Sequence, residues 1–399
     1  MMTPTDYMRS YMSQSWVLNE VDGSIRAVAG EDAAAEEEEE NRTDITPLEA
    51  FSAVNAEGEP LLADMHNAAM AFPHKFDKCL NHQELNRIPS LYCYDHTRVI
   101  VSEDHGKGDY YHASFVDGYN KKNAYIFAQA PFDDDSETVF WRMVADQKPS
   151  MILVFGVVDE KQKRKNKLEI ANRGFEKSIL SEFNAKTLTE CEQKAKLCRT
   201  FWPESGGVKS FEKLTIKTTD DNSETHMKTY SLQVKDGSVE GGKSSILMHF
   251  YEWGEKNDDE LPEYMLDMRA SIKVQYIRSS KTSNACTGPV MLVCATGVSK
   301  CSIYATVDII VSRMTEEHTV GFKETMSAIK SQRYGCFRSA APYMTAREML
   351  MKFAVSTGVV HDAAIGDKPK TNKSKMKLNN KKPKGIAGKM KAGPKKKKK

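Results

Sequence analysis

Three short, continuous runs of apolar residues are the clearest feature of the hydrophobic pattern. They cover residues 151–158, 245–250 and 290–293, and the last is entered through Gly288 and Pro289. An apolar run of this length without alternation is typical of a strand that is buried on both faces of a sheet. The sequence therefore predicts three buried strands within a folded domain.

Three further stretches show the spacing of apolar residues that indicates a helix. The first follows Ser136, and the third begins with the capping-box pair Thr345 and Glu348. Helices mixed with strands predict an α/β or α+β domain in which helices cover a central sheet. The apolar faces of the first two stretches are formed by Val139, Phe140, Met143 and Val144, and by Ile303, Val307, Ile310 and Met314.

The distribution of charge sets the expected limits of this domain. The 399 residues carry a formal net charge of +2, yet fifteen lysines and no acidic residue lie between positions 368 and 399. The N-terminal part contains a run of five glutamates. We therefore predict a disordered acidic arm over 1–45, a folded domain over 46–360 and a disordered lysine-rich tail over 361–399.

The remaining segments show no signal for a membrane. Residues 161–196 and 217–242 are charged and weakly patterned, which indicates surface loops or insertions. No apolar run reaches the roughly 20 residues of a transmembrane helix, and residues 1–16 lack the apolar stretch of a secretory signal. We expect the protein to act inside the cell, in the cytoplasm with the nucleus as an alternative.

The eight cysteines are scattered along the chain without a C-x-x-C pair, and no histidine cluster has the spacing of zinc ligands. This pattern indicates neither a disulfide framework nor a metal site, and we expect no cofactor. Seven of the cysteines are interpreted as small buried hydrophobic residues. Cys294 is the exception, because it follows a buried strand and begins a motif.

Several short motifs follow one another in a fixed order. Asn-Arg at 86–87 precedes Tyr-Asp-His-Thr-Arg-Val at 94–99, and further blocks lie at 109–119, 124–131, 140–144 and 198–203. Each block alone is weak, but together they resemble the classical protein tyrosine phosphatase family. The resemblance implies a protein tyrosine phosphatase-like fold with a central mixed twisted sheet flanked by helices. The divergent pocket and lysine-rich tail are similar to members of the set expanded in nematodes.

The motif that begins at Cys294 resembles the phosphate-binding loop of this family. In the family, His-Cys-x5-Arg-Ser/Thr joins a buried strand to a helix, and backbone N–H groups surround a phosphate dianion. The resemblance implies that Cys294 is the nucleophile. It implies that the phosphate is bound by Ala295, Thr296, Gly297, Val298, Ser299 and Lys300.

Three residues of the motif depart from the family pattern. Lys300 replaces the arginine, and an ammonium group cannot hold two phosphate oxygens through a rigid fork. Val293 replaces the histidine before the nucleophile, and Cys301 replaces the hydroxyl residue after the arginine. We therefore expect Cys294 to be less ionised than in an active relative, and the transition state to be poorly stabilised.

The other positions that carry the chemistry are also altered. Glu255 aligns with the general acid, although Asp258 or Asp259 is an alternative and a solvated acidic loop anchored by Trp253 is the simpler interpretation. Ile88 occupies the position of the tyrosine that stacks on the substrate ring. Pro342 lies where a glutamine orients the hydrolytic water in the family.

Together these departures predict a pseudophosphatase, whose partner is a phosphotyrosine-containing or other signalling protein. It either binds phosphotyrosine as a decoy or acts as a scaffold that does not depend on phosphate. The alternative is a slow or specialised phosphatase that uses Cys294, Lys300 and Glu255. The lysine tail is either a solubilising extension or a non-specific contact for polyanions.

Overall fold

The computed structural model describes seven ranges that together carry the sheet and its helices. The predicted arms at 1–45 and 361–399 lie outside the described residues, as do the charged segment 161–196 and the loop with Glu255, Asp258 and Asp259. None of the described helices combines the length and the apolar character needed to cross a membrane. The described ranges are 74–89, 91–156, 198–237, 242–253, 264–317, 320–337 and 340–358.

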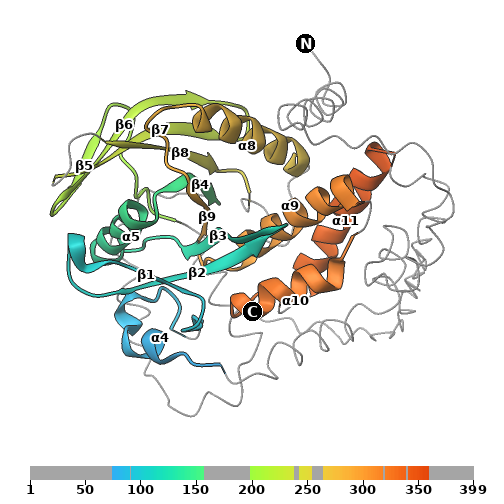
Figure 1. Ribbon diagram of the computed structural model, residues 1–399, viewed down its shortest axis with the longest axis horizontal. Helices are drawn as coiled ribbons and strands as arrows, with labels where there is room; N and C mark the ends of the chain where they lie inside the picture. Colours follow the sequence, from blue (N-terminus) through green and yellow to red (C-terminus); the bar gives the residue numbers. More distant parts are fainter. Residues whose placement is uncertain are drawn as a thin grey trace, which may run out of the picture.

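A nine-stranded mixed sheet forms the centre of the described part (Figure 1). The three predicted runs are β4, β8 and β9, and they lie side by side in its middle, so these predictions are confirmed. Strands β3, β9, β4 and β8 are parallel, whereas all other neighbours are antiparallel. In spatial order the strands are β1 (Arg98–Ile100), β2 (Tyr110–Gly118), β3 (Lys121–Gln129), β9 (Gly288–Cys294), β4 (Pro149–Phe155), β8 (Lys243–Phe250), β7 (Lys228–Asp236), β6 (Leu214–Ser223) and β5 (Val208–Phe211).

Helices cover both faces of this sheet, which confirms the predicted fold class. On β9, Leu292 and Cys294 belong to one apolar cluster, and the alternate residues Met291 and Val293 belong to the other. The first cluster is closed by α8 (Met265–Ser280), α9 (Ser299–Glu317), α10 (Phe322–Gln332) and α11 (Ala340–Ser356). The second is closed by α5 (Asp134–Gln147), and shorter elements are α4 (Asp77–Asn81), η2 (Gln83–Leu85) and η3 (Glu103–His105).

The segment 217–242 is largely a hairpin, so its interpretation as a surface loop or insertion was wrong. Strands β6 and β7 pair antiparallel over most of their length, and β7 pairs with β8. One face of the hairpin is buried through Ile216, Thr218, Leu232 and Val234. The opposite face carries uncharged polar residues and lysines, so the hairpin contains few apolar residues that could reveal the alternation in the sequence.

Two of the predicted helix starts are shifted. The N-cap of α5 is Asp133, whose side chain accepts from the Ser136 N–H at 2.8 Å, so Ser136 lies inside the first turn. Helix α11 begins at Ala340, ahead of the capping-box pair at Thr345. A cap motif indicates only that a start is locally favourable, and backbone hydrogen bonding extends the helix beyond it.

Candidate active site

The candidate site is the loop that connects β9 to α9. Cys294 is the last residue of β9, and α9 begins at Ser299. The loop is anchored to the sheet, because the Ala130 N–H donates to the Cys294 carbonyl at 2.8 Å. It also turns on itself, since the Gly297 N–H donates to the same carbonyl at 3.1 Å and the Val298 N–H donates to Thr296 Oγ1 at 3.2 Å.

Gly297 is the residue that makes this turn possible. Its φ of +67° lies in the left-handed region. A Cβ at this position would lie 2.4 Å from the Gln129 nitrogen and 2.5 Å from the Ala128 carbonyl carbon. Both are backbone atoms of β3 or its end, so they cannot move aside as a side chain would. The loop therefore lies against the sheet only because residue 297 has no side chain.

The Cys294 thiol lies in an environment that favours its ionised form. Cys301 Sγ donates to Cys294 Sγ at 3.4 Å, and Thr296 Oγ1 lies 3.8 Å from the same sulfur. Burial on its own raises the pKa of the Cys294 thiol, but the hydrogen bond from Cys301, the charge of Lys300 and the contact with Thr296 outweigh it and hold the pKa well below its ordinary value. How this ionisation compares with that of an active relative stays a prediction.

Lys300 supplies a buried positive charge beside the loop. The residue is 6% exposed although it carries an ammonium group. Its Nζ lies close to Gly156, at 3.9 Å from the point that a Cβ on this glycine would occupy. The Trp253 carbonyl oxygen lies 3.8 Å from the same point. The side chain thus extends toward the end of β4 and the buried Trp253, while its charge still acts on the Cys294 sulfur.

Arg333 holds the loop from behind. It is fully buried after α10, and its Nε donates to the Gly297 carbonyl at 3.1 Å. Its Nη1 donates to Ser114 Oγ at 3.1 Å and contacts Cys93 Sγ at 3.5 Å, and its Nη2 donates to His112 Nδ1 at 2.8 Å. The sequence analysis assigned Arg333 no role. It belongs to the segment Gln-Arg-Tyr-Gly at 332–335, and that short segment is the only signal in the sequence that could have pointed to it.

His112 is kept neutral by the same arrangement. Burial, followed by the nearby charge of Arg333, lowers the pKa of His112 to about 3. Its Nε2–H donates to the Leu91 carbonyl at 3.0 Å, which leaves Nδ1 to accept from Arg333. Both ring nitrogens are therefore hydrogen-bonded, and the ring links the Leu91 carbonyl to Arg333.

Gln129, at the end of β3, fixes the segment that carries Ile88. Its Oε1 accepts from the Arg87 N–H at 3.0 Å, and its Nε2 donates to the Leu85 carbonyl at 2.5 Å. Ile88 is 4% exposed and belongs to the apolar cluster that contains Cys294. The segment thus places Ile88 in the same apolar cluster as Cys294, as a buried aliphatic side chain and not as an aromatic ring.

The structure brings most of the predicted site residues together and leaves others outside the described part. Residues 294–300 form one loop and helix start, and the apolar cluster includes Ile88. Glu255 lies outside the described residues, although Trp253 is buried as predicted. Pro342 lies in the first turn of α11, where proline is tolerated. In the described ranges, no group of three or more histidine, cysteine or acidic residues is arranged to hold a metal ion.

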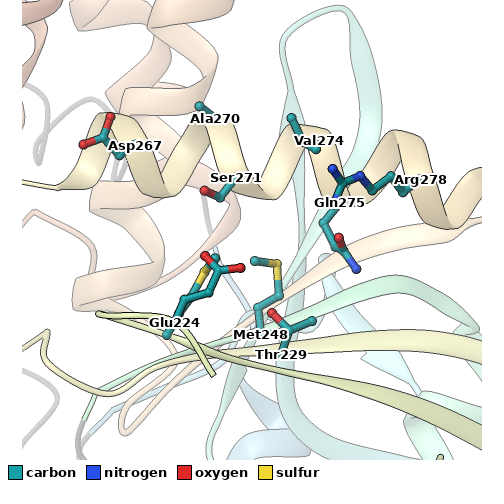
Figure 2. Close-up of a pocket in the computed structure, with 10 residues that line it drawn as sticks. Glu224, Thr229, Met248, Asp267, Ala270, Ser271, Val274, Gln275 and Arg278 are labelled. Atoms are coloured by element: carbon teal, nitrogen blue, oxygen red, sulfur yellow. The ribbon is translucent and has the colours of Figure 1, made fainter. Parts of the chain in front are cut away.

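A separate cavity of about 350 Å³ lies between α8 and strands β7 and β8. In Figure 2, Glu224, Thr229 and Met248 lie below the helix, and Ser271 and Gln275 project from it toward them. The lining contains none of the residues that the sequence analysis assigned to the site. The candidate site is therefore identified by the chemistry of its loop and not by the size of a cavity.

Comparisons with known proteins show which family the chain is similar to. A family model described as protein-tyrosine phosphatase matches residues 82–169 and 186–352, which is more than half of the chain. Receptor-type tyrosine-protein phosphatase zeta of Rattus norvegicus is 25% identical over 284 residues, covering 68% of this chain and 10% of that protein. Receptor-type tyrosine-protein phosphatase F of Mus musculus is 26% identical over 274 residues, covering 68% and 12%.

A viral protein is similar over a larger share of its own length. Tyrosine phosphatase H3 of Microplitis demolitor bracovirus is 23% identical over 301 residues, covering 67% of this chain and 82% of the viral protein. The chain therefore spans only about a tenth of the two receptor-type relatives but most of the viral one.

Proposed function

The chain belongs to the protein-tyrosine phosphatase family, and from this premise we propose that it is a catalytically impaired member that binds phosphotyrosine-containing protein. The observation that carries the proposal is the loop between Cys294 and α9. It joins a strand to a helix N-terminus, with the buried cation Lys300 in the first turn. Backbone N–H groups at a helix start and a nearby cation attract a phosphate dianion.

The substitutions in the loop support impaired turnover. Lys300 attracts an anion as a point charge, whereas the arginine of the family stabilises two oxygens of the transferring phosphoryl group at once. Val293 offers no polar group, and its side chain packs in the apolar cluster beneath α5. Binding of the ground state is thus preserved better than binding of the transition state, which lowers the rate of the chemical step.

A slow phosphatase is the second candidate function, and the ionisation of Cys294 favours it. Burial opposes the thiolate, yet the hydrogen bond from Cys301 and the charge of Lys300 leave the pKa of Cys294 well below its ordinary value. A thiolate next to a phosphate site is a competent nucleophile. Trapping of a phosphocysteine at Cys294 after rapid acid quenching would support this candidate over the first.

Hydrolysis of a generic aryl phosphate by the purified full chain tests the proposal. Wild type, Cys294→Ser and Lys300→Arg are assayed beside an active tyrosine phosphatase under the same conditions. We expect wild type to release no more phosphate than Cys294→Ser. Robust turnover by wild type that Cys294→Ser abolishes would refute the proposal and favour the slow phosphatase. The Lys300→Arg variant shows whether a guanidinium group at this position is enough to restore hydrolysis.

The lysine-rich tail and the place of action in the cell stay proposals from the sequence. Fifteen lysines without an acidic residue favour salt-dependent contact with polyanions. The absence of aromatic residues between 368 and 399 argues against stacking on bases. Binding of the full chain to heparin at rising salt concentration measures the contact, and binding that does not weaken with salt would contradict it.

A further inference from the structure

A cavity of about 880 Å³ lies at the other end of the central strands from Cys294. It is lined by η3, the end of α5, β7 and the segments that lead into β8 and β9. Its residue Cys286 lies two positions before β9, whereas Cys294 is the last residue of that strand. Seven strand residues at about 3.3 Å each separate the two ends by roughly 20 Å. The cavity is therefore distinct from the candidate active site.

Two lysines form a basic group in this cavity. Lys148 follows α5 with a φ of +47°, and its carbonyl accepts from the Gly288 N–H at 2.9 Å, which places it beside the segment before β9. Lys148 and Lys243 both lie close enough to Cys286 for their charges to oppose the burial that raises the pKa of this thiol. Among the described residues, neither ammonium group has a hydrogen-bond or ion-pair partner. An anionic group between them would gain two charged contacts.

An acceptor-rich group lies in the same cavity. His105 Nε2 is 3.8 Å from Asp146 Oδ1 and 3.8 Å from Asp236 Oδ2. Burial raises the pKa of Asp146, although the Ser102 N–H donates to its Oδ2 at 2.6 Å. His105 is 9% exposed, and its Nδ1 has no hydrogen-bond partner within the described ranges. An ammonium group suits this surrounding, because its three N–H donors can each reach a different oxygen.

The walls of the cavity are held in place by hydrogen bonds to the backbone. Arg142 of α5 donates to the Ser102 carbonyl at 2.7 Å and to the Lys107 carbonyl at 2.6 Å, which fixes the η3 segment against the helix. Lys213 Nζ donates to the Asp104 carbonyl at 3.0 Å. A ligand therefore enters a space that already exists, and little ordering opposes its binding.

We propose that this cavity binds a small zwitterion, with its anionic group between Lys148 and Lys243 and its ammonium group between Asp146 and Asp236. Small-molecule sites have volumes of roughly 300–1,000 Å³, so the cavity is large enough. A simple anion would be repelled by the two carboxylates, and a simple cation by the two lysines. A molecule that carries both charges avoids both penalties. Its lining contains no Phe, Tyr or Trp on which a flat ring could stack.

Titration of the full chain with a series of ω-amino acids tests the proposal. Glycine, 4-aminobutyrate, 6-aminohexanoate and 8-aminooctanoate carry the same two charges at growing separation, whereas hexanoate and hexylamine carry one charge each. Saturation-transfer NMR measures the Kd of each compound. We expect one amino acid to bind saturably and at least about tenfold more tightly than hexanoate or hexylamine, because each of them lacks one charge-assisted contact. Equal affinity for the amino acid and a singly charged compound would overturn the proposal, as would no saturable binding by any amino acid.

Variants of the two charged groups locate the bound molecule. The double variant Lys148→Gln with Lys243→Gln removes the basic group, and both side chains are exposed, so its thermal unfolding midpoint should match that of wild type. Asp146→Asn removes a charge and keeps an oxygen that accepts from the Ser102 N–H. Asp236→Asn, at a partly exposed carboxylate, repeats the test. Each change should weaken binding of the best amino acid by at least about tenfold.

Two lysine variants outside the cavity are the matched controls. Lys121→Gln changes an exposed lysine of β3, and Lys300→Ala changes the lysine of the candidate active site. Both should bind the amino acid as wild type does, whether or not the chain binds phosphotyrosine. Binding that survives the loss of the basic group and of both aspartate charges would overturn the proposal. Binding that is lost in Lys300→Ala alone would place the anionic group in the loop after Cys294 and would overturn it as well.

Discussion

Two sets of residues around the loop after Cys294 can be compared. One set anchors the loop and its surroundings, and the other is predicted to carry its chemistry. Arg333 joins the loop to Ser114 of β2 through buried hydrogen bonds, and Gln129 holds the neighbouring segment at Arg87 against the end of β3. By contrast, Lys300, Cys301 and Ile88 are positions at which the sequence predicts departures from the chemistry of the family. Removing a buried partner leaves another polar group unpaired, at a cost of about 1–3 kcal/mol. We therefore expect substitutions of Arg333 and Gln129 to lower the stability of the protein.

The largest effect on stability is expected from Arg333→Met. The variant removes the donor to Gly297, Ser114 and His112 at once, so it leaves several buried acceptors unpaired. We expect the free energy of unfolding to fall by about 3 kcal/mol or more. Urea denaturation followed by tryptophan fluorescence measures the change.

Arg313→Ala is the matched control for this change. Arg313 forms a partly exposed ion pair with Glu317 of the same helix, α9, at 2.9 Å. Such pairs contribute about 0.5 kcal/mol or less. Equal losses of unfolding free energy in the two variants would show that the buried hydrogen bonds of Arg333 do not stabilise the protein more than a partly exposed ion pair does.

Gly297→Ala is expected to have the next largest effect. Its Cβ would overlap backbone atoms of Gln129 and Ala128, in addition to straining a φ of +67°. Gly206 has a φ of +68° with no atom near a Cβ, so Gly206→Ala isolates the conformational strain at about 1 kcal/mol. We expect Gly297→Ala to lose at least about 2 kcal/mol more than this control in the same denaturation experiment.

If the two glycine variants are equally stable, the loop is free to move away from β3. That outcome would contradict the close contact on which the phosphate-binding geometry depends. Phosphopeptide binding by Gly206→Ala should match wild type, and binding by Gly297→Ala should be lost.

The last effect follows from a change of pH and not from a substitution. Burial lowers the pKa of His112 to about 3 and that of His249 to about 4, so both are neutral when folded and take up protons near pH 6.5 when unfolded. Their contribution to stability is complete above pH 6.5 and is lost as the pH falls toward 4 and 3. Each histidine contributes a slope of about 1.4 kcal/mol per pH unit in that window.

His249→Gln should remove about half of this slope between pH 6 and 4.5. The buried carboxylate of Asp308 does not contribute to the slope in this pH range, because its pKa lies below it. Burial opposes its charge, but Lys273 and Arg269 lower the pKa of Asp308 to about 2, so its contribution is lost only below pH 3.8. A stability that is flat between pH 6.5 and 4.5 would contradict the buried, neutral histidines.

The central strands and the loop were predictable from the sequence because their signals are local. The runs that became β4, β8 and β9 are apolar without interruption, and the motif at Cys294 is contiguous. The hairpin of β6 and β7 was missed because polar and charged residues outnumber the few apolar residues on its buried face. The role of Arg333 was missed because its bonds to Ser114 and His112 join positions more than 200 residues apart.

The most direct test is titration of the full chain with a phosphotyrosine peptide and its unphosphorylated twin, with phosphate release monitored in the same cell. Charge-assisted hydrogen bonds contribute about 1.5–3 kcal/mol, so we predict roughly tenfold or tighter binding of the phosphopeptide. Lys300→Ala should remove most of that difference, and no phosphate should be released. Equal affinity for both peptides, or turnover that depends on Cys294, would contradict a site that binds phosphotyrosine without hydrolysing it.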